Sequence, residues 1–305
     1  MRILIVYDVP GWAYWRRAKA LQRYAPEDFE VDIVSSSEIF QSRRDYDLVF
    51  NLEYVLPGLG RQQCPNAVQV IGYNSGPRWR TELWQDVRNS SDFVIANNRG
   101  IWEEFDRQEK TCNISNGVDL NEFRSLRMPR EASMWLWTGS VRHAETKGYS
   151  KVVIPLAEMC HDEGISFKVE LADSKNPALE GESLVRWYNS GSFYLCCSQS
   201  EGTPNPLLEA MACGCIPIST PVGNAPEIIK DGVNGFLIDQ TPESALAAIK
   251  VAIDHRAELA HAAHVSIQSW DWKLRSQYFF ALFRKLIHRE PVKPFTWQHV
   301  TPEEI

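Results

Sequence analysis

The fold of this chain is most readily inferred from the segment between Ser198 and Asp239, SQSEGTPNPLLEAMACGCIPISTPVGNAPEIIKDGVNGFLID. A strand-like run ends just before it, and a loop then leads to a predicted helix. Asn205 is a favourable N-cap and Pro206 a favourable first helical residue, so we expect the helix to begin there and to run to Gly214. The segment therefore has the strand–loop–helix order of a ligand-binding α/β sheet.

The start of this helix has the chemistry of a phosphate site. Backbone N–H groups and a partial positive charge at a helix N-terminus suit an anion. Pro204 and Pro206 have no N–H group, and two carboxylates, Glu201 and Glu209, bracket the loop as acceptors suited to sugar hydroxyls. Either glutamate taken alone would be interpreted as a solvated surface residue. The expected backbone donors are those of Gly202, Thr203, Asn205, Leu207 and Leu208.

Outward from this segment, short apolar runs alternate with longer amphipathic ones along the whole chain. Strands alternating with helices indicate parallel βαβ units and an open, doubly wound sheet. The runs form two series, so we expect two Rossmann-like α/β domains facing a central cleft, where ligands bind beyond the carboxyl ends of the strands. The predicted strands are 2–7, 31–34, 47–52, 68–72, 93–96 and 112–115, followed by 134–138, 165–172, 193–197, 216–219 and 236–239.

The length of 305 residues suits this two-domain organisation. We predict a compact N-terminal domain at residues 1–128 and a nucleotide-binding domain at 129–270. A closing helix and tail at 271–305 would return to the N-terminal domain, because the aromatic side chains of the tail need a surface to pack on. The hydrophobic content of 44% and the charged content of 23% are ordinary for a soluble globular protein.

Bulk charge and cysteine content narrow the classes of partner. The net charge of -7 disfavours nucleic acid or an anionic membrane as the main partner. The apolar run at the N-terminus is too short for a signal peptide, and no stretch approaches the length of a transmembrane helix. Seven cysteines without framework spacing indicate free thiols, and Cys213 and Cys215 lack a second cluster that would complete a metal site. We expect a cytoplasmic protein and leave its oligomeric state open.

At this point the Ser198–Asp239 segment resembles the retaining GT-B glycosyltransferases of family 4. The family pattern has two glutamates eight positions apart, the second inside Glu-Ala-Met-Ala-x-Gly, followed by a Pro-bearing strand, a glycine loop and Pro-Glu-Ile. The resemblance extends from residue 112 to 288. The matching residues are Ser198, Glu201-Gly202, Glu209 to Gly214, Pro217, Gly223, Pro226-Glu227-Ile228, Asn234-Gly235, Asn116 to Asp119, and Ser269 to Trp272.

A further element, Thr138-Gly139-Ser140-Val141-Arg142 followed by Lys147-Gly148, is similar to the family's Gly-Arg…Lys-Gly element. The resemblance implies that Arg142 and Lys147 neutralise the leaving diphosphate, so that neither a metal nor a cofactor is needed. A solvated arginine and lysine in an ordinary loop are the alternative interpretation.

The resemblance also implies a reaction. A sugar would pass from a UDP- or GDP-sugar to a hydroxyl of a carbohydrate or other acceptor, with retention through front-side attack. Glu209 would bind the ribose and Glu201 the transferred sugar. A nucleic acid or protein acceptor stays open but is not favoured. The remaining donor-binding residues would be Gly139, Gly202, Thr203, Pro204, Asn205, Leu207 and, from the first domain, Gly11.

The first domain departs from the family pattern. Its opening loop has the single glycine Gly11, and Tyr73 or Asn74 stands near the position where the family commonly has a histidine. Indole rings suit sugar rings and arginines suit anions, so we place the acceptor side among nearby tryptophans and arginines. These are Trp12, Trp15, Arg16, Arg17, Arg78, Trp79 and Arg80, for each of which core packing or a solvated surface is the alternative.

Other functions on the same fold remain open. A sugar-nucleotide epimerase, a phosphorylase or a non-catalytic nucleotide-sugar-binding protein would share these motifs, although no lysine is placed to hold pyridoxal phosphate. Asp45-Tyr46-Asp47 mimics the metal-binding Asp-x-Asp of a different glycosyltransferase fold. It precedes a strand of the first domain, far from the donor motifs in the sequence, so we interpret it as surface.

Overall fold

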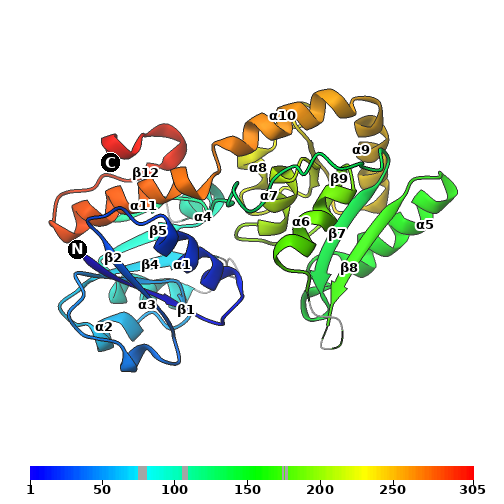
Figure 1. Cartoon of the computed structure of the whole chain (residues 1–305). Coiled ribbons are helices and arrows are strands. Elements are labelled where there is room, and N and C mark those ends of the chain that lie inside the picture. The colour runs from blue at the N-terminus through cyan, green and yellow to red at the C-terminus, as the bar shows by residue number, and fades with distance from the viewer. Residues whose placement is uncertain (75–80, 105–108, 174, 176–177) are drawn as a thin grey trace. The chain divides into compact units, whose positions relative to one another are not determined.

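The computed structural model divides into two compact units, each an α/β assembly (Figure 1). Unit 1 comprises residues 1–116 and 272–305, and unit 2 comprises residues 117–271. The structure describes residues 1–74, 81–104, 109–173, 175 and 178–305, without the side chains of Thr81 and Glu82. Of the helices in this described part, none is both long and apolar enough to cross a membrane.

Unit 1 contains a seven-stranded parallel sheet with the order β12-β6-β5-β4-β3-β1-β2. The strands β1 to β6 match the first predicted series. The seventh strand was missed, because its two residues acquire strand character only by pairing with β6. The bounds are β1 (Arg2–Tyr7), β2 (Glu30–Ser35), β3 (Leu48–Asn51), β4 (Val68–Tyr73), β5 (Phe93–Ala96), β6 (Thr111–Asn113) and β12 (Phe295–Thr296).

Helices cover both faces of this sheet. Side chains of α1 (Ala13–Arg23) and α11 (Trp272–Ile287) pack on one face, where the rings of Phe50 and Phe283 lie 5.3 Å apart. The other face carries α2 (Leu59–Gln63), α3 (Thr81–Ser90) and α4 (Arg99–Glu104). The alternating side-chain direction of the buried strands supplies an apolar surface to each layer. Short 3-10 turns occupy Ile39–Gln41, Trp297–His299 and Pro302–Glu304.

Unit 2 contains a five-stranded parallel sheet with the order β11-β10-β9-β7-β8. All five strands were predicted from the second series of apolar runs. Together the two sheets confirm the prediction of two doubly wound α/β domains. The strands are β7 (Trp135–Ser140), β8 (Phe167–Ala172), β9 (Phe193–Cys196), β10 (Ile216–Ser219) and β11 (Phe236–Leu237).

The helices of unit 2 also form two layers. Trp135 and Trp137 are fully buried against the layer that contains α5 and α9, whereas α6 and α7 pack together on the opposite face (Figure 1). The bounds are α5 (Ile154–Asp162), α6 (Gly181–Ser190), α7 (Asn205–Ala212), α8 (Ala225–Ile228), α9 (Pro242–Asp254) and α10 (Arg256–Gln268), with a 3-10 turn at Val141–His143 and a π-helical turn at Tyr149–Val153.

The structure places the boundary between the units before the predicted one at residue 128. Residues 117–128 belong to unit 2, because the Val118 N–H donates to the carbonyl of Trp270 at 2.9 Å and the Leu126 N–H to Asn189 at 2.9 Å. Sequence composition changes after Met128-Pro129, but these backbone hydrogen bonds determine where the segment packs. The closing helix and tail belong to unit 1, where Phe295 pairs with Cys112.

We predict that Phe279→Ala destabilises unit 1 by about 3 to 5 kcal/mol, because it empties a fully buried site against Phe50 and Phe283. Leu274→Ala on the same helix is the matched control. Leu274 is 43% exposed, so its loss should stay near or below about 0.5 kcal/mol. Urea unfolding followed by circular dichroism measures both values, and similar losses for the two variants would contradict the packing described.

Candidate functional site

The candidate site lies at the carboxyl ends of β7 and β9. In the sheet, β8 lies on one side of β7 and β9 on the other, so the strand order reverses between β7 and β9. Ligands of open α/β sheets bind at such switch points. The loop after β7 carries Arg142 and Lys147, and the loop after β9 carries Ser198 and Glu201. Four residues from separate motifs thus follow two neighbouring strands.

Lys147 and Glu201 form an ion pair at this edge. The Lys147 ammonium lies 3.0 Å from Oε1 of Glu201, and the Ser198 hydroxyl donates to the same oxygen at 2.8 Å. Burial lowers the pKa of Lys147, but the Glu201 carboxylate and the neighbouring cysteines outweigh it, so the net pKa lies above the ordinary lysine value. The ammonium therefore stays charged at neutral pH.

The backbone of the Lys147 loop is fastened to the end of β9. Gly148 has a φ of +77°, and a Cβ atom there would lie 2.4 Å from the carbonyl oxygen of Cys197. The Gln199 N–H donates to the Thr146 carbonyl at 2.9 Å, and the Cys197 thiol lies 3.3 Å from the Lys147 carbonyl. Only glycine permits both the left-handed turn and this approach. The close approach brings Lys147 within reach of Glu201.

A second glycine supports the Glu201 loop from the other side. Gly223 has a φ of +56°, and a Cβ atom there would lie 2.5 Å from the Gly202 carbonyl oxygen. The neighbouring Asn224 is fully buried, and its amide donates to the Thr203 hydroxyl at 3.2 Å. The loop that contains Gly223 and Asn224 therefore holds the backbone at Gly202 and Thr203 in position. Sequence reasoning did not single out Asn224, because its contact with Thr203 spans two separate loops.

The helix start differs from the prediction. Pro204 is the N-cap of α7 and Asn205 is already its first residue, so the helix begins one position earlier than expected and ends at Ala212. Three of the five expected amide donors are used within this turn. The Asn205 N–H donates to Thr203, and the N–H groups of Leu207 and Leu208 both point to Pro204. Two of these bonds close the first helical turn on the Pro204 carbonyl, and all three leave less amide capacity for an anion than predicted.

Glu209 lies on the buried side of α7. It is 6% exposed and accepts a hydrogen bond from the Tyr188 hydroxyl at 2.9 Å. Burial and the nearby Glu209 carboxylate raise the pKa of Tyr188 well above its usual value, so the hydroxyl stays protonated and donates. No sequence signal pointed to Tyr188, because this contact joins two helices, α6 and α7.

The remaining donor-side candidates surround these residues. Gly139 follows Trp137, whose indole ring would lie 2.4 Å from a Cβ atom added at Gly139. Arg142 is exposed in the 3-10 turn after β7, outside the Lys147–Glu201 contact. A small hollow lies beside the ion pair and is also lined by residues of the α7 start. Its lining includes Thr138, Lys147, Ser198, Glu201, Pro204 and Leu207.

In unit 1, Gly11 and Trp12 lie in the loop after β1. Gly11 has a φ of +82° with open space where a side chain would begin, and Trp12 is 44% exposed. Both are therefore accessible to a ligand, as a donor or acceptor contact requires. Trp15 and Arg16 are half-buried on α1. Arg78, Trp79 and Arg80 lie outside the described residues.

Three other unit 1 candidates are built into the core. Tyr73 packs against Tyr54 with ring centroids 4.7 Å apart. Asn74 is buried, donates to the carbonyls of Leu52 and Gly72, and accepts a hydrogen bond from Arg17. Burial lowers the pKa of Arg17 to about 9. Arg17 thus follows the core-packing alternative rather than the acceptor-side interpretation, because the apolar face of α1 carries it inward.

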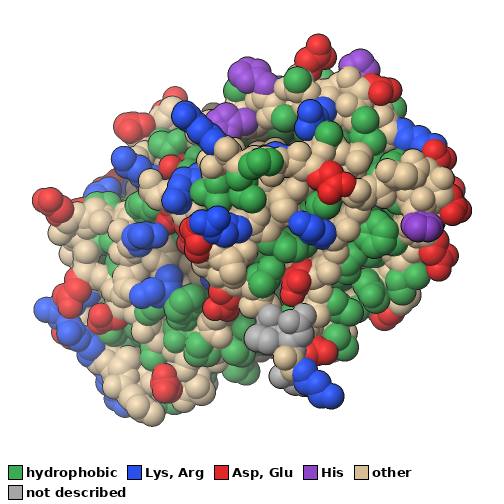
Figure 2. Space-filling model, turned by 45° about the vertical axis from the view of Figure 1, so that its right-hand side comes forward, with side chains coloured by type: hydrophobic (Ala, Val, Ile, Leu, Met, Phe, Trp, Pro, Cys, Tyr) green, Lys and Arg blue, Asp and Glu red, His purple; other side chains and the backbone are tan. Residues whose placement is uncertain are grey.

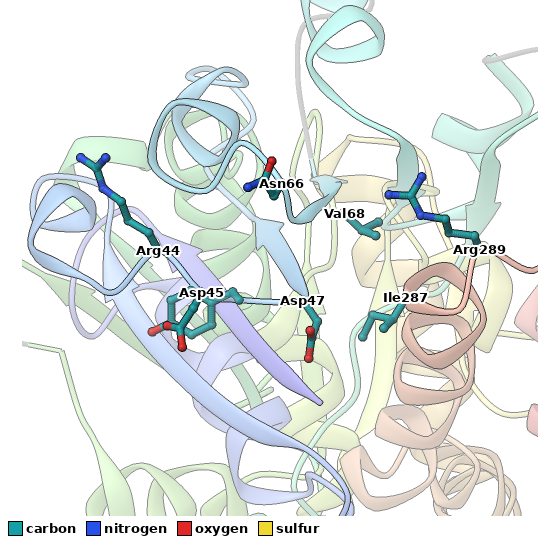
Figure 3. Close-up of a pocket in the computed structure, with 8 residues that line it drawn as sticks. Arg44, Asp45, Asp47, Asn66, Val68, Ile287 and Arg289 are labelled. Carbon is teal, nitrogen blue, oxygen red and sulfur yellow. The ribbon is translucent and has the colours of Figure 1, made fainter.

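A separate hollow in unit 1 lies at the amino ends of β3 and β4 (Figure 3). It contains the Asp45-Tyr46-Asp47 stretch. The guanidinium groups of Arg44 and Arg289 point away from the two carboxylates in Figure 3. Asp45 pairs with Arg2, and Asp47 accepts the Arg2 backbone N–H at 2.7 Å. These groups do not converge on one ligand, in agreement with the surface interpretation of Asp45-Tyr46-Asp47.

Within the described residues, no group of three or more His, Cys, Asp and Glu side chains is arranged to hold a metal ion. Figure 2 shows Lys and Arg side chains interspersed with Asp and Glu over the drawn face. The charge of that face is mixed, whereas a nucleic-acid-binding surface presents a basic field.

Comparisons with known proteins bear on these motifs. Residues 155–255 match the family model described as glycosyl transferases group 1. The residues matched by this family model include Ser198, Glu201 and Glu209.

Two curated relatives are D-inositol 3-phosphate glycosyltransferases. The one from Streptomyces griseus is 31% identical over 267 residues, covering 68% of this chain and 57% of the relative. The one from Streptomyces scabiei is 23% identical over 233 residues, covering 61% and 52%. The chain thus spans little more than half the length of these relatives.

Solved structures agree in fold. Sucrose-phosphate synthase from Thermosynechococcus elongatus has a TM-score of 0.73 at 15% identity, covering 95% of this chain and 100% of that one. HepE from Anabaena, solved with UDP-glucose, has a TM-score of 0.68 at 15% identity, covering 95% and 100%. A glycosyltransferase from Rickettsia africae has a TM-score of 0.69 at 12% identity, covering 94% and 98%. The predicted GT-B fold, two Rossmann-like domains in one chain, is confirmed.

We predict that Gly148→Ala destabilises unit 2 by about 3 kcal/mol or more, because the new methyl group meets the Cys197 backbone. Gly164→Ala is the matched control. Gly164 has a φ of +69° with nothing within 4 Å of an added Cβ, so its loss should reflect only the left-handed backbone, about 1 kcal/mol. Denaturant unfolding compares the two variants, and equal losses would show that the contact with Cys197 has no steric importance.

Proposed function

We propose that this chain is a glycosyltransferase that moves a sugar from a UDP- or GDP-sugar to an acceptor hydroxyl with retention of configuration. The observation that carries the proposal is the Lys147–Glu201–Ser198 cluster at the carboxyl ends of β7 and β9. It joins two separate motifs at the position where an α/β sheet binds its ligand. The family match and the neighbouring HepE structures with UDP and UDP-glucose support a nucleotide-sugar donor.

The proposed roles follow from charge and burial. Lys147 and Arg142 hold the diphosphate and stabilise the charge that develops on it as it leaves. Glu209 accepts from the ribose hydroxyls, with Tyr188 orienting its carboxylate. Glu201 accepts from a hydroxyl of the transferred sugar. Two cations at the leaving group supply the neutralisation that a metal provides in other transferases, so we propose a metal-independent reaction without a cofactor.

The proposed chemical step is a front-side displacement. The bond between the anomeric carbon and the diphosphate oxygen breaks, and the acceptor oxygen forms a bond to the same face of that carbon. The acceptor proton passes to the leaving phosphate oxygen, so no side chain is needed as a base. The acceptor is a carbohydrate or another hydroxyl compound, for which the exposed indole of Trp12 offers a stacking surface.

The first test is a panel of UDP-, GDP-, ADP- and CMP-sugars, followed by thermal shift and by slow donor hydrolysis. We expect stabilisation by UDP- or GDP-sugars and release of free sugar over time. Binding without hydrolysis or transfer would favour a non-catalytic nucleotide-sugar-binding protein. The buried position of Asn74 favours that alternative, since both N–H groups of its side chain are already donated to backbone carbonyls. Epimerised donor would indicate a sugar-nucleotide epimerase.

We predict that Arg142→Ala weakens donor binding about tenfold, because it removes a charge-assisted contact to the diphosphate. Glu209→Gln should weaken it similarly through the ribose. Arg186→Ala is the control, since Arg186 is exposed on α6 and pairs only weakly with Glu182 across one helical turn. Isothermal titration with the donor identified by the panel measures the effect. If both variants bind like the wild type, the assignment of the site is wrong.

A further inference from the structure

Lys147 and Glu201, which are proposed to bind two different parts of the donor, bind each other in this structure. Glu201 receives both Lys147 and Ser198 on Oε1, and its side chain is 17% exposed. Without a donor, the carboxylate intended for a sugar hydroxyl instead holds the ammonium intended for a diphosphate. Each group therefore uses part of its binding capacity on the other, and a ligand that binds either group competes with this contact.

The backbone around Lys147 limits how that displacement can occur. The Lys147 N–H donates to His143 at 3.0 Å, and the loop is anchored to β9 through Gly148, Cys197 and Gln199. Because the Cα position is held by these contacts, the ammonium changes partner by rotation of its own side chain. The exchange is therefore local: Lys147 turns from a carboxylate to a phosphate, and Glu201 turns from an ammonium to a hydroxyl.

We propose that Glu201 makes the site select the intact sugar donor over the spent nucleoside diphosphate; this inference rests on the proposed function. An intact donor gives each member of the pair a new partner when their contact breaks. Its diphosphate binds Lys147, and its sugar hydroxyl donates to Glu201. The spent diphosphate gives a new partner only to Lys147. Its terminal phosphate also carries an additional charge near neutral pH, which the Glu201 carboxylate repels.

Glu201 therefore has a second role after the sugar has been transferred. With the sugar gone, its carboxylate loses the hydroxyl and again competes for the Lys147 ammonium. The ion pair that closes in the empty site promotes release of the diphosphate. Ser198 assists as a positioning residue, because its hydroxyl holds Oε1 in place throughout the exchange.

The test compares Glu201→Gln with the wild type by isothermal titration, using UDP and UDP-glucose and, separately, GDP and GDP-glucose. Glutamine removes the charge but keeps a carbonyl oxygen that accepts from a sugar hydroxyl. We expect the diphosphate to bind about tenfold tighter and the intact donor to change less than threefold, so that discrimination is lost. Unchanged discrimination, or weaker diphosphate binding, would overturn the proposal.

Two further variants separate this effect from a general change in charge or fold. Glu163→Gln breaks an exposed ion pair with Lys250 in the same unit and should leave both affinities unchanged. In a Lys147→Met background, Glu201→Gln should tighten diphosphate binding less than in the wild type, because the competition for the ammonium has been removed. If Glu201→Gln does not fold, Ser198→Ala is measured instead, with a smaller loss of discrimination expected and an unchanged ratio as the contrary result.

The same titrations distinguish failure of the proposed function from failure of the selection of intact donor. If the wild type binds none of the four nucleotides, the proposed function fails and the role of Glu201 falls with it. If the wild type binds them and Glu201→Gln leaves their ratio unchanged, only the selection of intact donor fails. The readout is equilibrium affinity, so it does not depend on knowing the acceptor.

Discussion

The candidate site depends on the close contact between the loops that follow β7 and β9. Gly148 lies against the carbonyl of Cys197, and Gly223 lies against the carbonyl of Gly202. Each approach is closer than any side chain would permit. These loops of unit 2 therefore pack through direct backbone contacts. The contacts hold the main chain near Lys147 and Glu201, and so their side chains meet. A site of this kind is preorganised by sterics before any charge acts.

Much of this arrangement could be predicted from the sequence. Apolar runs alternating with amphipathic ones predicted every strand of the two sheets except β12, because a parallel strand buried on two faces is almost continuously apolar. Lys147 and Glu201 were predicted as functional residues in separate motifs, and they meet because both motifs follow neighbouring strands. Their ion pair was not predicted, since spacing along the chain contains no information about which side chains satisfy each other in the absence of a ligand.

Other residues could not be assigned from local patterns. Arg17 and Asn74 were both candidates for ligand contacts, with core packing left open for Arg17, yet Arg17 donates a hydrogen bond to Asn74 inside unit 1. Tyr188 and Asn224 had no signal at all, although they contact Glu209 and Thr203. The start of α7 lies one residue earlier than expected, with Pro204 as its N-cap and no side-chain cap, whereas propensity favours asparagine at that position. Tertiary contacts therefore decided where four of these side chains lie: Arg17, Asn74, Tyr188 and Asn224.

The division of unit 1 between residues 1–116 and 272–305 has a consequence for the order of folding. The sheet face around Phe50 is covered by Phe279, Phe280 and Phe283, which leave the ribosome only after the whole of unit 2. During synthesis unit 2 can therefore form a complete core while the first sheet still exposes one apolar layer. The sheet of unit 1 therefore completes its core only after unit 2 has been synthesised.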